Sequence, residues 1–386
     1  MFYIREAADR KSEYIDLLKE VGSLSNLFSE NPVPYLYYRA AENIFCRAFN
    51  AENLSRGDVS ADAAKNKIGI GLKTFMHGNG KTLQKVAEFN KDANTFEGKE
   101  AEEIATIISE MRNDRLQFTE RAYGLNEMIY HMVTREEGKF HLFEEPMDHI
   151  DLSSLKVLKR TKNAVSFKDR HAEYNFYIPK STLFKRFITD KAIETFDVDI
   201  LKDPFTHLLN KPEDTLYLVK EKEVKEETFD YVYLPLYSPN NGEVHISSGL
   251  NQWNAKGRKR HHDELYIPVP VWIHRDFKDF FPYQLGSGQT GTPFTLKLPD
   301  GIEYTAKICQ ENGKALMTNP NRLLGHWLLR HVLQIPVGKL VTIDMLESIG
   351  IDSVKLTKLS DNKFRIDFAK VGSYEQFENE FKDSKK

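Results

Sequence analysis

The chain has 386 residues, of which 40% are hydrophobic and 12% aromatic, so it is long enough to form two domains that each bury a core. Its formal net charge of −3 gives no overall sign of nucleic-acid binding, although phosphates respond to local patches rather than to totals. The two cysteines, Cys46 and Cys309, argue against a disulfide framework and fit a reduced cytoplasmic protein, and without a long apolar run or an apolar N-terminal signal region we expect no membrane segment.

Helices and strands alternate over the first half of the chain. Apolar residues recur at helical spacing in residues 6–27 and 33–49, which predicts two helices. The stretch IGIGLKTF at 68–75 follows a polar, turn-rich segment and predicts a short strand. Two further helices are expected at 84–96 and 98–124, followed by several strands at 125–180. The pattern predicts an α+β domain with helices on each side of a sheet.

The pattern of predicted elements changes after residues 202–229. The prolines and dense charges of this segment predict a linker, with a solvated loop inside one domain as the alternative. Beyond it come short predicted strands, the later ones including KLVTIDML at 339–346, around one amphipathic helix at 322–333. This pattern predicts a small β-barrel. We therefore expect an N-terminal domain at 1–210, a linker at 211–227, a barrel domain at 228–375 and a tail at 376–386.

Lys73 stands in an apolar strand, where a lysine must reach a partner or open space. Asp62 lies 11 positions before it, Asp58 lies 15 before it and Glu88 lies 15 after it. Carboxylates are the ligands that Mg²⁺ prefers, and Mg²⁺ can offset phosphate charge and lower the pKa of a water. A nearby lysine can orient that water or stabilise charge at the phosphate. The pattern fits phosphodiester hydrolysis, and it also fits an ordinary strand–loop–helix with solvated charges.

This region resembles the core of the PD-(D/E)XK nucleases, which carry an acid two residues before the lysine. Gly71 occupies that position here, and some family members carry the displaced carboxylate on the next helix, where Glu88 is expected. The resemblance implies that Asp62 and Glu88 hold Mg²⁺ and that Lys73 faces the phosphate. Gln84, one helical turn before Glu88, would then support the site from the same face.

Two other acids are alternatives for holding the metal. Glu42 lies in the preceding predicted helix, from which some family members direct a residue into the site. Asp58 competes with Asp62, which we prefer because its spacing from Lys73 suits a hairpin of two adjacent strands.

A basic stretch runs from Lys156 to Lys191, with ten Lys or Arg residues against three acids. Aromatic residues are interleaved with the basic ones. Two interpretations stay open: the stretch contacts DNA phosphates, or it is a solvated basic face on strands whose aromatics belong to the core.

Two polar segments of the second half carry side chains suited to reading bases. Arginine can contact guanine, and Asn or Gln can contact adenine, in the major groove. The first segment, at 247–270, offers Gln252, Asn254, Arg258, Arg260, His262 and Asp263. The second, at 309–330, offers Gln310, Asn312, Lys314, Asn319 and Asn321.

Residues 228–370 resemble the B3-like DNA-recognition domain found at the C-terminus of several bacterial restriction endonucleases. The strings GLNQWNAKGRKR, ELYIPVP, AKICQENGKALMTNPN and LGHWLLR carry the resemblance. In that family, two arms of a β-pseudobarrel enter the major groove. The resemblance implies a first arm near Gln252 to Asp263 and a second near Gln310 to Asn321, without implying which side chain reads which base.

The two resemblances together imply a type II restriction endonuclease: an α+β chain with a PD-(D/E)XK-like α/β nuclease core followed by a B3-like β-pseudobarrel. Related enzymes often pair the B3-like domain with an H-x-K nuclease, but neither His77-Gly-Asn79 nor His141-Leu-Phe143 fits that motif. We expect Mg²⁺ as cofactor, double-stranded DNA as partner, a homodimer, a bacterial cytoplasmic location and a cognate methyltransferase acting on the same site. The alternative is a sequence-specific DNA-binding regulator whose N-terminal domain is not catalytic.

Overall fold

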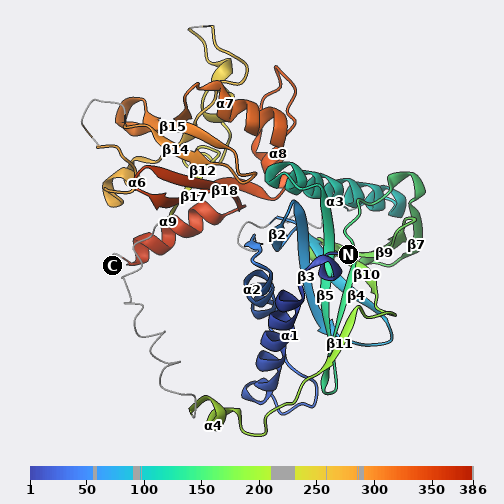
Figure 1. Cartoon of the computed structure of the whole chain (residues 1–386). Coiled ribbons are helices and arrows are strands. Elements are labelled where there is room, and N and C mark those ends of the chain that lie inside the picture. Colours follow the sequence, from blue (N-terminus) through green and yellow to red (C-terminus); the bar gives the residue numbers. More distant parts are fainter. Residues whose placement is uncertain are drawn as a thin grey trace. The chain divides into compact units, whose positions relative to one another are not determined.

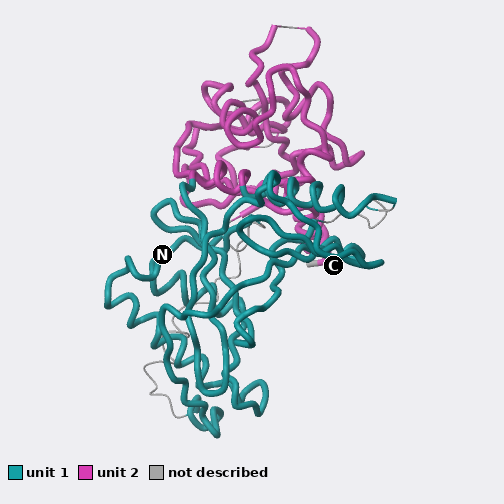
Figure 2. Tube along the Cα trace, turned by 90° about the vertical axis from the view of Figure 1, so that its right-hand side faces the viewer, with its two compact units in different colours: residues 1–116, 125–225 teal, residues 117–124, 226–386 magenta. Residues whose placement is uncertain are grey.

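The computed structural model describes residues 1–54, 59–89, 96, 98–209, 231–257, 259–284, 286 and 291–384. The chain divides into two compact units (Figure 2). Unit 1 comprises Met1–Leu116 and Leu125–Lys225, and unit 2 comprises Gln117–Gly124 and Glu226–Lys386. Unit 2 is therefore built from two pieces that lie far apart in sequence. The predicted linker at 211–227 falls outside the described residues.

A six-stranded sheet forms the centre of unit 1, in the order β1-β2-β3-β5-β6-β11 (Figure 1). Its strands are β1 (Glu52–Asn53), β2 (Ala63–Lys65), β3 (Ile68–Met76), β5 (Glu127–Glu136), β6 (Lys139–Pro146) and β11 (Glu194–Asp197). β3 and β5 run parallel, whereas the other neighbours are antiparallel. A parallel pair needs a long crossover, and the segment between β3 and β5 provides it.

Two helices, α1 (Ala8–Ser23) and α2 (Tyr38–Phe49), cover one face of this sheet (Figure 1). Their apolar side chains recur at helical spacing and pack on alternate residues of the strands. The buried cluster includes Tyr14, Leu18, Phe45 and Phe49 from the helices and Ile70, Leu72, Val133 and Leu142 from the sheet. The 3-10 helices η1 (Tyr3–Arg5) and η2 (Ser25–Leu27) flank α1. This core fixes β3, the strand that carries Lys73.

A second sheet of unit 1 is antiparallel and has the order β4-β10-β9-β8-β7. Its strands are β4 (Lys81–Glu88), β7 (Lys156–Arg160), β8 (Ala164–Lys168), β9 (Glu173–Tyr177) and β10 (Thr182–Ile188). Helix α3 (Ala101–Tyr123) packs its Ile104 and Ile108 against Phe167 and Phe176 of this sheet. Phe187 of β10 joins the two sheets, because its ring centroid lies 4.9 Å from that of Tyr130 on β5. Short helices η4 (Leu152–Ser154), η5 (Ile178–Lys180) and α4 (Pro204–Leu209) complete the unit.

Unit 2 contains a seven-stranded sheet in the order β12-β17-β18-β14-β15-β16-β13. The strands are β12 (Tyr231–Pro235), β13 (Ile267–Pro268), β14 (Phe294–Lys297), β15 (Glu303–Cys309), β16 (Ala315–Thr318), β17 (Ile351–Ser360) and β18 (Lys363–Lys370). The two edge strands, β12 and β13, lie beside each other, so the sheet curls nearly into a barrel. This shape agrees with the predicted small β-barrel.

Helices and turns surround the barrel-like sheet. They are η6 (Gly249–Asn254), α6 (Val271–Asp276), η7 (Glu311–Gly313), α7 (Arg322–Gly325), the π-helix η8 (His326–Val332), α8 (Ile343–Ser348) and α9 (Ser373–Ser384). Residues Gln117–Gly124, at the end of α3, belong to the same unit: the Phe118 ring centroid lies 5.0 Å from that of Phe368, and Arg121 Nε donates to the Val332 carbonyl at 2.9 Å.

Three local predictions are wrong. Residues 84–88, the start of the helix predicted at 84–96, lie instead in strand β4, which pairs along β10 from Thr182↔Glu88 to Ile188↔Lys81. Residues 343–348 form helix α8 rather than a strand, and Thr342 Oγ1 caps it by accepting from the Met345 amide at 3.4 Å. The predicted tail lies in helix α9, whose Phe377 is buried.

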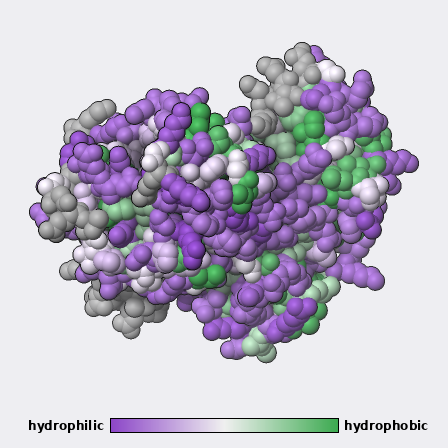
Figure 3. Space-filling model, turned by 90° about the horizontal axis from the view of Figure 1, so that it is seen from above, coloured by the Kyte–Doolittle hydropathy of each residue, from purple (hydrophilic) through white to green (hydrophobic). Residues whose placement is uncertain are grey.

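No helix among the described residues is long and apolar enough to cross a membrane. On the face drawn in Figure 3, hydrophilic residues predominate and hydrophobic ones form separate small groups. Such scattered groups are normal for a folded chain and mark no particular docking area.

Candidate functional site

Asp62 is fixed beside the strand that carries Lys73. It directly precedes β2, which runs antiparallel to β3. Its backbone amide donates to the Ile70 carbonyl at 2.8 Å, and its carboxylate Oδ2 accepts from the Leu72 amide at 2.7 Å. The predicted hairpin of two adjacent strands is therefore present, and it brings Asp62 next to Lys73 in space.

The charges of Asp62 and Lys73 act on each other in a partly buried site. Burial lowers the pKa of Lys73, and Asp62 is the largest charge that opposes this shift. Burial also raises the pKa of Asp62, against the effects of Lys73, the Leu72 amide and Arg39. Burial thus disfavours the charged form of each group, and the opposite charge of the other group offsets part of that effect.

Glu42 belongs to the same cluster. It is buried on α2, and its Oε2 forms an ion pair with Arg39 at 2.9 Å. Its charge also acts on Lys73. Burial raises the pKa of the Cys46 thiol to about 12, with Glu42 and Asp62 adding to the shift, so this cysteine stays a neutral thiol. The charges of Glu42 and Asp62 therefore both act on Lys73 and on Cys46.

A second set of polar side chains borders this cluster, and sequence reasoning did not find it. Arg112 of α3 donates to the Tyr130 hydroxyl at 2.9 Å and to Ser60 Oγ at 3.0 Å. Lys185 of β10 pairs with Glu145 of β6. Their partners lie on different strands and helices, so no sequence spacing reveals them.

Gly71 does not leave open space beside Lys73. A Cβ built at this residue would lie 2.5 Å from Met147 Cε and 3.1 Å from Tyr130 Cδ1. The side of the strand where family members carry an acid is therefore filled by two buried side chains. Gly71 therefore does not make room for metal, water or DNA on this side of the strand.

Glu88 and Gln84 lie on β4, in the other sheet of unit 1, and not on a helix after β3. Glu88 is exposed and forms an ion pair with Lys85 at 3.0 Å. It is not among the leading charges that act on Lys73. Gln84 is partly buried and stands opposite Lys185 in the β4–β10 register. Asp58 lies outside the described residues.

The donor set of the Glu42–Asp62 cluster fits a magnesium ion. Two carboxylates supply hard oxygen ligands, and the nearby Cys46 is held as a neutral thiol that does not compete. Burial raises the pKa of Asp62, and the charges of Lys73 and Arg39 compensate only part of that shift. A cation held by Asp62 and Glu42 would supply the missing compensation.

The basic stretch occupies β7 to β10. Its Phe167 and Phe176 belong to the core, whereas Lys156, Lys159 and Arg160 of the edge strand β7 are exposed. Several of the other basic residues are paired, as Arg186 is with Glu173 at 2.7 Å. Phe167, Tyr174 and Phe176 therefore belong to the core, and contact of the exposed basic residues of β7 with phosphates stays a prediction.

In unit 2, the first predicted arm holds two residues inside the fold. Gln252 is 3% exposed and donates from Nε2 to Glu264 Oε1 at 3.2 Å. Asp263 forms an ion pair with Arg330 at 2.6 Å. Both side chains are therefore occupied in holding the arm. Of the other predicted residues of this arm, Asn254 and His262 are exposed and Arg260 is partly exposed. Arg258 lies outside the described residues.

The second predicted arm is centred on the turn η7 between β15 and β16. Buried His274 donates from Nε2 to the Gly313 carbonyl at 2.9 Å, and a Cβ at Gly313 would lie 2.5 Å from Tyr283 Cε1. Gly313 has a φ of +66°, which glycine adopts without strain. The predicted side chains Gln310, Asn312, Lys314 and Asn319 are exposed, and Asn321 is partly exposed. A rigid turn thus presents polar side chains to solvent.

Residues 222–360 match the family model described as the NgoFVII C-terminal B3-like DNA-binding domain. A search of curated proteins found no match for the chain. The match covers both arms and the barrel-like sheet that holds them. The second unit of this chain is therefore similar to the B3-like DNA-binding domain of a restriction-enzyme family.

Proposed function

We propose that the protein is a type II restriction endonuclease, a Mg²⁺-dependent enzyme that cuts double-stranded DNA at a specific sequence. One observation carries the proposal: Asp62, Lys73 and Glu42 meet on adjacent elements of a chain whose second unit matches a restriction-enzyme DNA-binding domain. Phosphodiester cleavage needs charge compensation at the phosphate and an activated water, and this cluster contains groups suited to both.

Each residue of the cluster has a proposed role. Asp62 and Glu42 would hold Mg²⁺, which neutralises phosphate charge and lowers the pKa of a water when it is bound. Lys73, whose pKa is lowered by burial, would accept a hydrogen bond or proton from the attacking water or donate to a phosphate oxygen. Arg39 pairs with Glu42 and would orient its carboxylate.

Lys73→Ala separates cleavage from recognition. We expect the wild type to cut plasmid DNA at one sequence in Mg²⁺ and to stop when EDTA is added. The variant should lose at least about 100-fold in cleavage rate, because a charged group at the phosphate is removed. Its affinity for the same DNA should stay unchanged, since the arms lie in unit 2. Sequencing the ends of digested genomic DNA reports both the site and the cut position.

A wild-type protein that binds a specific sequence and leaves it uncut in Mg²⁺ would establish the alternative, a DNA-binding regulator. Gly71, in the position where the nuclease family carries an acid, is the observation that favours this alternative.

A set of four variants tests which carboxylates hold the metal. We expect Asp62→Ala and Glu42→Gln to abolish cleavage, because each removes one proposed ligand. Glu88→Ala should cut normally, since Glu88 is exposed and paired with Lys85. If Glu88→Ala is inactive and Glu42→Gln is active, the displaced acid is Glu88 after all. Normal cutting by Asp62→Ala together with loss in Asp58→Ala would move the first ligand to Asp58.

A further inference from the structure

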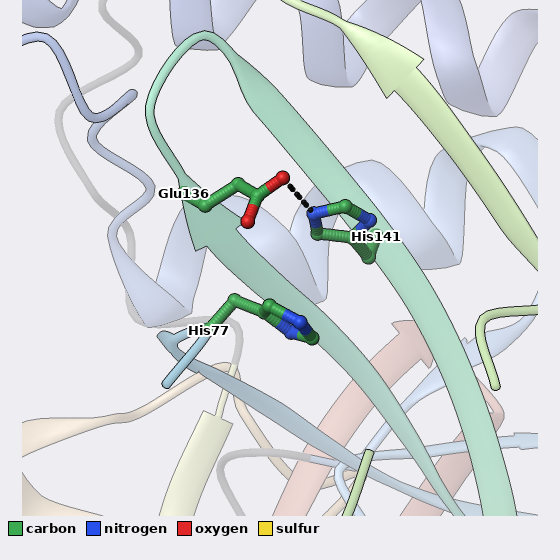
Figure 4. A group of neighbouring side chains, drawn as sticks. All are labelled: His77, Glu136 and His141. Atoms are coloured by element: carbon green, nitrogen blue, oxygen red, sulfur yellow. Dashed lines mark ion pairs between the residues drawn. The ribbon is translucent and has the colours of Figure 1, made fainter. Parts of the chain in front are cut away.

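Three metal-ligating side chains meet at one end of the six-stranded sheet, away from Asp62. His77 directly follows β3, Glu136 ends β5 and His141 lies on β6. Within the described part of the chain, their ligand atoms all lie within 4.8 Å of one another. Figure 4 shows the three side chains converging from the β5–β6 hairpin and the end of β3.

Regular strand pairing holds the three residues in place. The His77 amide donates to the Arg135 carbonyl at 2.7 Å and so continues the β3–β5 ladder. The β5–β6 hairpin pairs Glu136 with Lys139 and Thr134 with His141. The cluster therefore stands on three neighbouring strands rather than on loose loops, which is the more precise way to position a site.

Both imidazoles direct one nitrogen at a threonine. Nδ1 of His77 lies 3.0 Å from Thr134 Oγ1, and Nδ1 of His141 lies 2.9 Å from Thr195 Oγ1. A threonine hydroxyl can accept a hydrogen bond from a protonated Nδ1. The Nε2 atom of that tautomer then carries a lone pair that can bind another partner. Outer hydrogen bonds of this kind fix the tautomer and the ring orientation of histidines that bind metals.

The Nε2 atom of His141 gives independent support for a bound ion at this cluster. This atom is buried and makes no well-oriented hydrogen bond in the described residues, although Glu136 Oε1 lies only 3.0 Å away. Ligand atoms around a tetrahedral zinc ion lie roughly 3.3 Å apart, which is close to this separation.

We propose that His77, Glu136 and His141 form a binding site for a divalent transition-metal ion, and that Zn²⁺ fits it best. Two imidazoles and one carboxylate are a common zinc donor set, with a water completing the coordination. Glu136 is 40% exposed and leaves one side of the site accessible to that water. Imidazole does not suit Mg²⁺, so this site differs in chemistry from the Asp62 cluster. The ion would link the ends of β3, β5 and β6.

Zinc binding by the full chain, without DNA, tests the proposal. Calorimetric titration of chelator-stripped protein with Zn²⁺ should show one tight site per chain, and the same protein loaded with Co²⁺ should show visible d–d absorption. His77→Ala and His141→Ala should lose at least about 100-fold in affinity. Thr195→Val keeps all three ligands and removes one outer hydrogen bond, so its affinity should fall about 10-fold.

His171→Ala is the matched control, because His171 of the same unit also faces a carboxylate, that of Asp148 at 3.6 Å. It should bind zinc as the wild type does. Should His77→Ala or His141→Ala fail to fold by circular dichroism, Glu136→Gln and Thr195→Val still decide the matter. The proposal is overturned if the wild type binds no Zn²⁺ at micromolar concentration, or if Glu136→Gln and Thr195→Val bind it with unchanged affinity. Neither result depends on whether the protein cuts DNA.

Discussion

Residue 71 shows how one missing side chain shapes the candidate nuclease site. Met147 and Tyr130 fill the volume where a family member carries a carboxylate, and both are buried at 3% exposure. An acid here would have to displace packed side chains, and close-packed cores resist added volume. In the proposed site the carboxylates would therefore come from other elements, and the charges of Asp62 and of Glu42 on α2 both act on Lys73.

Gly71→Asp should consequently destabilise the protein instead of improving catalysis. We expect a loss of about 1–3 kcal/mol in the free energy of unfolding, measured by urea denaturation. Met147→Ala removes the nearest clashing atom, so the double variant should lose less than the sum of the two single losses. Gly78→Ala is the control, because the nearest atom to its Cβ would be Thr82 Oγ1 at 3.8 Å. Strict additivity would show that Met147 does not fill this position.

At the scale of elements, some strands and helices are set by local apolar periodicity, whereas others are set by pairing with distant segments. The parallel strands β3 and β5 and helices α1 to α3 have clear apolar periodicity, and the sequence predicts them. Residues 84–88 are predicted as helix because Gln, Lys, Ala and Glu favour helices, but pairing with β10 overrides that preference. Helix α8 carried a usable signal, since Thr342 is a good helix N-cap.

The first arm of unit 2 depends on a close approach between elements. A Cβ at Gly325, the last residue of α7, would lie only 1.7 Å from the Asp263 carbonyl oxygen. No side-chain rotation can relieve a clash with backbone. Asp263 also accepts from Arg330 at 2.6 Å, so the same contact fixes the polar arm on the helix.

Gly325→Ala should therefore displace the arm. We expect a loss of roughly 3 kcal/mol or more in the free energy of unfolding, together with weaker DNA binding in an electrophoretic mobility assay. Asn254→Ala is the comparison, because this exposed residue of the same arm can change DNA affinity without changing stability. A Gly325→Ala protein with the unfolding midpoint and DNA affinity of the wild type would contradict this account of the arm.

At the scale of the whole molecule, the sequence identified the second unit better than the first. Its arms and strands form a long, specific string, and the family match over 222–360 agrees with that prediction. The sequence did not show that Gln252 and Asp263 are committed to internal contacts, because their partners Glu264 and Arg330 are recognisable only in the fold. The pairs Arg112–Tyr130 and Lys185–Glu145 could not be predicted either, because their partners are also brought together only by the fold.

A duplex cut at a symmetric sequence has two equivalent scissile phosphates, and two identical chains related by a twofold axis match that symmetry. We expect the Lys73→Ala protein to bind its DNA site as a dimer. Sedimentation of the complex should give two chains per duplex. One chain per duplex, accompanied by nicking of one strand by the wild type, would rule out the symmetric arrangement.

Unit 2 contains Gln117–Gly124, which the ribosome makes long before Glu226–Lys386. Phe118 is 2% exposed in the finished protein, where its ring packs against Phe368. During synthesis Phe118 cannot make this contact until β18, which contains Phe368, has been made. Unit 2 is therefore completed only after β18 has been made, and until then the growing chain carries Phe118 without this apolar contact.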